Sequence, residues 1–196
     1  MKKAMGIGLG VVGLIVLVVA VASFRFSSIE TPDYEVIETW GKVEVRRYPK
    51  CIVAQTRVRN ASFKESGSSG FRVVAGYIFG GNETKQSISM TSPVVMEMGD
   101  KSTLEFVMPS KYRLEDLPKP LSDSVKIMEV APRVLAVLRF GGFSSDKKIA
   151  RYGKQLQEVL SSKQVKTRGN LLYMGYNAPW DVIGRRNEVA FEVVEE

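Results

Sequence analysis

The sequence predicts an α+β fold in which two pseudo-symmetric ββαββ repeats form a curved antiparallel sheet, or a distorted β-barrel, with two helices. Three observations predict this fold. Several short segments alternate apolar and charged residues, as half-buried strands do, and two longer segments repeat apolar residues at helical spacing. In addition, the pattern of residues 43–58 recurs at residues 125–140, which indicates an internal duplication.

One N-terminal hydrophobic helix is expected before this domain. Residues 4–24 carry no charge and follow two lysines, and about 20 helical residues are enough to cross a bilayer. Residues 1–26 are therefore predicted to be a membrane anchor, or a signal peptide that is cleaved near Ala22. In both cases the basic end stays in the cytoplasm, so residues 27–196 are expected to be membrane-anchored on the extracytoplasmic side or exported.

The first repeat is expected at about residues 34–109. Gly41 separates two alternating segments that are typical of a hairpin, and a third strand precedes a mainly helical stretch. In that stretch the spacing places Phe71, Val74 and Ile78 on one face. The expected elements, in chain order, are strands at 34–39, 42–48 and 51–58, a helix within 60–80, and strands at 87–98 and 103–108.

The second repeat is expected at about residues 125–194 and follows the same order. An offset of 82 residues pairs Val45 with Ile127 at equivalent strand positions. The helix of this repeat is predicted to begin near Ser144 and Ser145, because serine is a favoured helix N-cap. Agreement in strands, helix and closing strand supports the duplication.

Composition excludes several kinds of chemistry. The chain has no histidine, which excludes a Ser-His-Asp or Cys-His nucleophile and a histidine-ligated zinc site. Its one cysteine, Cys51, cannot form an intramolecular disulfide or a multi-cysteine cluster. No spacing of carboxylates identifies an acid/base pair, so no enzymatic activity is expected. Of the 28 basic residues, 25 lie scattered within residues 27–196, so no nucleic-acid partner is expected.

Four motifs occur in a characteristic order along the chain. They are Tyr77-Ile-Phe-Gly-Gly-Asn82, Ile88-Ser-Met-Thr-Ser-Pro-Val94, Phe140-Gly-Gly-Phe143 and Arg185-Arg-Asn-Glu-Val189. Together they resemble the SOUL/haem-binding protein family over about residues 30–194. The resemblance implies a β-barrel-like fold that is also found in GyrI-like effector domains. It also implies non-covalent binding of haem or another tetrapyrrole.

The resemblance further implies a pocket beside the first helix, formed by apolar residues with basic groups near the propionates of the ligand. Spacing alone also permits an ordinary core role for the apolar residues, and a surface role for the arginine. The last two residues of the predicted cofactor-binding set are neighbours that such a cleft could recruit. The set comprises Phe71, Arg72, Val74, Ala75, Ile78, Met90 and Tyr173.

The iron ligand is left unassigned by the sequence. Some members of the family are thought to use an axial histidine, which this chain lacks. Tyrosine, methionine and thiolate ligate haem in other proteins, which leaves Cys51, Met90 and Tyr173 as weak candidates. We therefore expect weak or absent axial ligation, with affinity from apolar burial and from pairing of propionates with Arg or Lys.

The predicted function is a membrane-tethered or exported haem- or tetrapyrrole-binding protein that is not an enzyme. One alternative is a GyrI-like module for another apolar or cationic small molecule, in which an inward-facing carboxylate such as Glu97 or Glu188 would receive the ligand. A second alternative is a ligand-free interaction scaffold.

Overall fold

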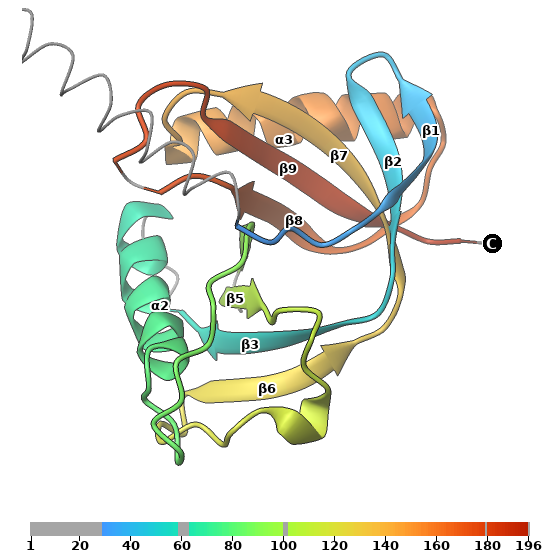
Figure 1. Ribbon diagram of the computed structural model, residues 1–196. Helices are drawn as coiled ribbons and strands as arrows, with labels where there is room; N and C mark the ends of the chain where they lie inside the picture. The colour runs from blue at the N-terminus through green and yellow to red at the C-terminus, as the bar shows by residue number, and fades with distance from the viewer. Residues whose placement is uncertain (1–28, 59–62, 100–101, 179, 196) are drawn as a thin grey trace, which may run out of the picture. The chain divides into compact units, whose positions relative to one another are not determined.

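Within the described residues, nine strands form one sheet in which all neighbours are antiparallel, in the order β1-β2-β7-β9-β8-β4-β5-β3-β6 (Figure 1). The computed structural model describes residues 29–58, 63–99, 102–178 and 180–195. The strands are β1 (Glu35–Trp40), β2 (Val43–Tyr48), β3 (Cys51–Arg57), β4 (Val94–Glu97), β5 (Thr103–Val107), β6 (Val125–Val130), β7 (Arg133–Gly141), β8 (Thr167–Gly175) and β9 (Arg186–Val193). The helices are α2 (Phe63–Ile78), α3 (Asp146–Ser162) and the short 3-10 helix η1 (Leu114–Asp116).

The predicted α+β class, with a large antiparallel sheet and two helices, is confirmed. A closed barrel is not formed, because β1 and β6 each pair with a single neighbour within the described residues. The strand order is compatible with two halves, β2-β7-β9-β8 and β6-β3-β5-β4, that meet where β8 pairs with β4. The internal duplication itself stays a prediction.

Local sequence signals position several of these elements. Gly41 lies in the turn between β1 and β2 with a φ of 63°, a left-handed conformation that glycine adopts without a steric penalty. Ser145 is the N-cap of α3, where its hydroxyl accepts a hydrogen bond from the backbone N–H of Lys148 at 3.3 Å. The predicted hairpin and the predicted start of the second helix are therefore confirmed.

The two faces of the sheet differ in what covers them. In β7, Ala136 and Leu138 join the large core cluster that contains the buried residues of both helices. The alternate residues Leu135 and Val137 belong to a smaller cluster that includes no helix residue. Since side chains alternate across a strand, α2 and α3 cover one face. No helix of the described residues covers the other, which is called the helix-free face below.

Helix α2 lies alongside β3 and β5 (Figure 1). Gly70 makes this close packing possible, because a Cβ atom there would lie 2.5 Å from Val58 Cγ1 and 3.0 Å from Leu104 Cβ. Only glycine fits between the helix and the sheet at this point. The glycine and serine run that weakens the helical signal in the sequence is thus part of the helix and of its packing.

The predicted strand at 87–98 is too long. The strand β4 begins only at Val94, directly after Pro93, which has no backbone N–H to offer to a ladder. Before it, the chain folds back on the end of α2, where the Asn82 amide donates to the carbonyls of Tyr77 and Gln86. This turn, rather than a strand, connects the helix to β4.

The expected membrane-anchored location is corrected. Among the described residues no helix is long and apolar enough to cross a membrane. The helices α2 and α3 have 16 and 17 residues, fewer than the roughly 20 that span a bilayer, and both carry charged side chains. The hydrophobic helix predicted within residues 1–26, with its cleavage site near Ala22, lies outside the described residues.

Candidate functional site

A groove of about 570 Å³ runs along the exposed side of α2. Its lining residues form two adjacent rows along the helix, and successive residues within each row are four positions apart. Residues four apart are neighbours on a helix surface, so the two rows make one stripe. The floor is largely helix backbone, since Gly67, Ala75 and Gly76 have little or no side chain. The complete lining consists of Gly67, Ser68, Phe71, Arg72, Ala75, Gly76 and Phe79.

Two phenylalanines give the groove its apolar walls. The ring of Phe71 is partly buried, and its centroid lies 5.2 Å from that of the core residue Phe106, which fixes its orientation. Phe79 follows the last residue of α2 and is 64% exposed. An aromatic side chain this exposed beside a groove offers apolar area that a ligand can cover.

Arg72 gives the groove its charge. Its side chain is exposed, and no ion pair or hydrogen bond joins it to another residue in the part of the chain that the structure describes. Its guanidinium is therefore available to a carboxylate on a ligand that rests in the groove. An apolar groove with a cation at its edge suits an amphipathic anion.

The predicted site residues do not all meet at this groove. Phe71, Arg72 and Ala75 line it, as the sequence analysis expects. Val74 and Ile78 face the core instead, and both are 0% exposed. Helical spacing identified the buried face of α2 correctly. That face packs on the sheet, however, and the groove lies on the adjacent face of the same helix.

Met90 and Tyr173 lie outside the groove lining. Met90 packs partly buried against the core cluster. The Tyr173 hydroxyl donates to the Asn187 side-chain carbonyl at 2.7 Å, and its ring contacts Phe63 with a centroid distance of 4.7 Å. Burial raises the pKa of Tyr173, which disfavours the phenolate that would ligate iron.

The weak metal-ligand candidates remain apart from the groove as well. Cys51 begins β3, and burial raises the pKa of its thiol, which disfavours a thiolate. The groove lining holds no imidazole, thiol, thioether or phenol group. The groove therefore offers no side chain that would ligate iron, and the iron ligand that the sequence leaves open stays unassigned.

Sequence reasoning missed four lining residues, Gly67, Ser68, Gly76 and Phe79. A signal for the last of them was present, because Phe79 continues the spacing of four from Phe71 and Ala75. The glycines left no such signal. A glycine that opens a groove and a glycine that packs against a sheet look alike in a sequence.

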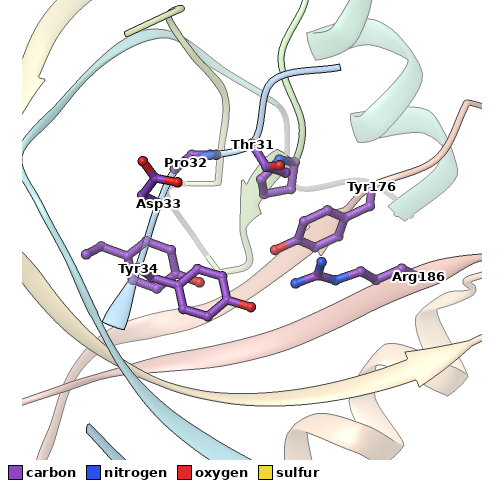
Figure 2. A pocket seen from close by; sticks show the side chains of 8 residues that line it. Thr31, Pro32, Asp33, Tyr34, Tyr176 and Arg186 are labelled. Carbon is purple, nitrogen blue, oxygen red and sulfur yellow. The ribbon is translucent and has the colours of Figure 1, made fainter. Parts of the chain in front are cut away.

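A second cavity, of about 260 Å³, lies on the helix-free face. Figure 2 shows Tyr34, Tyr176 and Arg186 directed toward one another, with the chain at Thr31 to Asp33 passing beside them. The complete lining is Thr31, Pro32, Asp33, Tyr34, Tyr48, Pro93, Tyr176 and Arg186.

Glu188 lies at this face and is 0% exposed. Its carboxylate accepts hydrogen bonds from Arg46 at 2.9 and 3.1 Å, from Arg186 at 3.0 Å and from the Tyr176 hydroxyl at 2.8 Å. Burial alone would raise the pKa of Glu188, but the hydrogen bonds and charge of Arg46, with the contributions of Tyr176 and Arg186, lower it below its usual value. This carboxylate is fully neutralised by the protein itself.

Guanidinium groups already cover the rings of two of the tyrosines that line the second cavity. The Arg186 guanidinium lies 3.9 Å from the centroid of the Tyr176 ring, and that of Arg46 lies 4.4 Å from Tyr34. These are the positions that a cationic ligand would take. Glu97, the other inward carboxylate considered above, accepts a hydrogen bond from Asn170 at 2.9 Å. The geometry therefore gives little support to a cation site at Glu188.

Comparison with solved structures defines the class of fold. The crystal structure of the EcmrR C-terminal domain matches with a TM-score of 0.59 at 10% identity, over 83% of this chain and 99% of that one. A crystal structure of a hydrolase from Listeria innocua matches with a TM-score of 0.56 at 8% identity, over 81% and 94% of the two chains. The chain thus shares the fold of these proteins, which fits the GyrI-like architecture expected from the sequence.

The SOUL heme-binding protein model matches residues 29–192, and the chain belongs to this family. Heme-binding protein 2 of Homo sapiens is 29% identical over 175 residues, which cover 83% of this chain and 85% of that protein. Heme-binding protein 1 of Xenopus laevis is 26% identical over 156 residues, covering 76% and 82%. The resemblance drawn from the four sequence motifs is confirmed.

Proposed function

We propose that this protein binds haem or a related tetrapyrrole non-covalently in the groove along α2, and that it acts as a binding protein and not as an enzyme. Family membership supports haem as the ligand. The observation that carries the choice of site is the pairing of an apolar groove with the available guanidinium of Arg72. The binding domain comprises residues 27–196.

The groove residues have distinct roles in this proposal. The apolar ring of the ligand rests on the bare stretch of α2 and is flanked by Phe71 and Phe79, whose burial supplies about 25 cal/mol for each Å² of apolar area removed from water. Arg72 pairs with a propionate at the exposed edge. A partly exposed contact of this kind contributes roughly 1 kcal/mol and fixes the orientation of the ligand.

The cation-binding alternative has weaker support. At the second cavity the buried Glu188 is paired with Arg46 and Arg186, whose guanidinium groups also cover the rings of Tyr34 and Tyr176. The one carboxylate in the cavity lining, that of Asp33, is exposed to solvent, which weakens its attraction for a cation. The free charge beside the larger groove is positive. Charge complementarity therefore favours an anionic ligand.

A haemin titration of the purified protein tests the proposal. We expect a Soret shift that saturates at one equivalent of haemin. Arg72→Glu replaces an attraction by a repulsion near a propionate, which should cost about 1.4–2 kcal/mol and weaken affinity roughly 10- to 30-fold. Lys64→Glu is the matched control, because it makes the same charge change on α2 outside the groove lining, and it should leave haemin affinity nearly unchanged.

Two results would contradict the proposal at different levels. Uptake of haemin without saturation would exclude a defined haem site and favour the ligand-free scaffold. Saturable binding that Arg72→Glu leaves unchanged, in a variant with a normal thermal melt, would remove Arg72 from the site and with it the assignment to this groove.

We also infer that the domain consists of two repeats, at about residues 34–109 and 125–194. The strand order supports this inference, because exchanging β2 with β6, β3 with β7, β4 with β8 and β5 with β9 reproduces the order of these eight strands in reverse. Each half then contributes one helix to the covered face.

A further inference from the structure

Two glycines of α2 have opposite surroundings. At Gly70 a Cβ atom would lie 2.5 Å from Val58, so the fold requires glycine there. At Gly76 a Cβ atom would meet nothing within 4 Å, and the backbone has no left-handed conformation that would call for glycine. Because glycine destabilises a helix interior relative to alanine, Gly76 weakens α2 without any packing benefit.

Gly76 lies in the lining of the groove. Residues three and four apart are neighbours on a helix surface, so a side chain at position 76 would project between Arg72 and Phe79. That is the space between the available cation and the exposed aromatic wall. Because Gly76 has no side chain, the apolar floor of the groove extends without interruption to Arg72.

We propose that Gly76 determines which ligands the groove accepts, by selecting a broad, flat anion over a narrow, linear one. The inference rests on the proposed function. A macrocycle needs the full width between Arg72 and Phe79 and must lie against the helix backbone. A linear alkyl carboxylate needs only a narrow channel beside Arg72 and Phe79, so its affinity gains little from the absence of a side chain at position 76.

Three variants test this role by thermal unfolding and by titration with haemin and with laurate. Gly76→Ala should keep the fold and raise the melting temperature by about 2–4 °C, the effect of removing a helical glycine. Gly76→Leu should weaken haemin binding at least about tenfold and change laurate binding much less. Ser69→Leu is the matched control, because it adds the same side chain to an exposed position of α2 that lines the opposite flank, and haemin affinity should stay within about twofold.

The outcomes separate the inference from the function on which it rests. Haemin binding by the unmodified protein that Gly76→Leu leaves intact would overturn the role of Gly76 and leave the haem site standing. Absence of saturable haemin binding by the unmodified protein would overturn both. If Gly76→Leu does not fold, Gly76→Ala still decides: a lowered melting temperature would show that the fold needs this glycine and would overturn the inference.

Discussion

At the scale of single residues, Glu188 joins strands that lie far apart in the sequence. It belongs to β9, and its carboxylate holds Arg46 of β2 through two hydrogen bonds while Tyr176 donates a third. Taking these charges out of water is expensive, so the network persists only while each member keeps its partners. Without the Glu188 carboxylate, Arg46 keeps only the half-exposed Glu44 as an acidic partner, and Arg186 keeps none among the described residues.

Glu188→Gln should therefore cost about 3–5 kcal/mol of unfolding free energy. The neutral amide cannot balance the charges of Arg46 and Arg186 in this buried position. Urea denaturation of both proteins measures the difference. Glu129→Gln is the matched control, because its ion pair with Lys50 is exposed and should contribute no more than about 1 kcal/mol. Equal losses from the two variants would show that the buried network does not stabilise the fold.

The same network predicts how stability depends on pH. The folded-state pKa of Glu188 lies below its ordinary value of 4.5, so the unfolded chain binds a proton at this site more readily than the folded one. The stabilisation is present above pH 4.5 and is lost as pH falls through the lower folded pKa. The difference in stability between the unmodified protein and Glu188→Gln should narrow in acid. A difference that is constant from pH 7 to pH 3 would contradict this assignment.

At the scale of elements, α2 uses its two sides for different tasks. One side packs on β3 and β5 and the adjacent side carries the groove. The packed side could be predicted, since burial imposes an apolar spacing that Phe71, Val74 and Ile78 display. The groove could be predicted only in part: Phe71 and Arg72 were identified, but its floor at Gly67 and Gly76 exists because these residues have no side chain. A periodic pattern of apolar residues does not indicate where the surface of a helix lacks side chains.

Gly70→Ala tests the packed side. The new methyl group would meet Val58, whose side chain has little rotamer freedom, and the Cβ of Leu104, which cannot move without its backbone. Overpacking costs about 1–3 kcal/mol and exceeds the gain in helix propensity of up to about 1 kcal/mol, so the variant should lose stability. Gly76→Ala, in contrast, is expected to increase the stability of the protein. Thermal melts of both variants measure it, and stabilisation by Gly70→Ala would disprove the close contact.

At the scale of the whole molecule, the strands could be located from the sequence but their order could not. Alternation fixes which residues face the core, and it does so one strand at a time. The pairings of β2 with β7 and of β3 with β6 join residues about 70–95 positions apart, and no local pattern specifies them. The sheet order depends on how the two halves fit together.

The duplication makes a prediction at this scale. Val45 pairs with Ala136, and Ile127 pairs with Ala54, so residues that the offset of 82 relates occupy matching registers. Val45→Asp and Ile127→Asp should both abolish soluble expression, because Val45 is buried and Ile127 packs partly buried against the core, and an unpaired carboxylate in the core costs several kcal/mol against a total stability of about 5–15 kcal/mol.

Met128→Asp is the control for this pair of variants. Met128 is adjacent to Ile127 in β6, and its side chain is exposed. This variant should express normally. A normal thermal melt for either Val45→Asp or Ile127→Asp would show that the two positions are not equivalent.

A sheet that is not closed into a barrel has two edge strands, and the unpaired backbone groups of an edge strand can pair with a strand of another chain. The outer edges of β1 and β6 carry backbone groups without a strand partner in the described chain. On β1 a bulge between Val36 and Glu38 breaks the regular ladder, and on β6 the exposed charges of Lys126 and Glu129 flank Met128. Both devices discourage edge-to-edge growth. A folded copy of this chain therefore presents two borders at which the addition of a further strand is opposed.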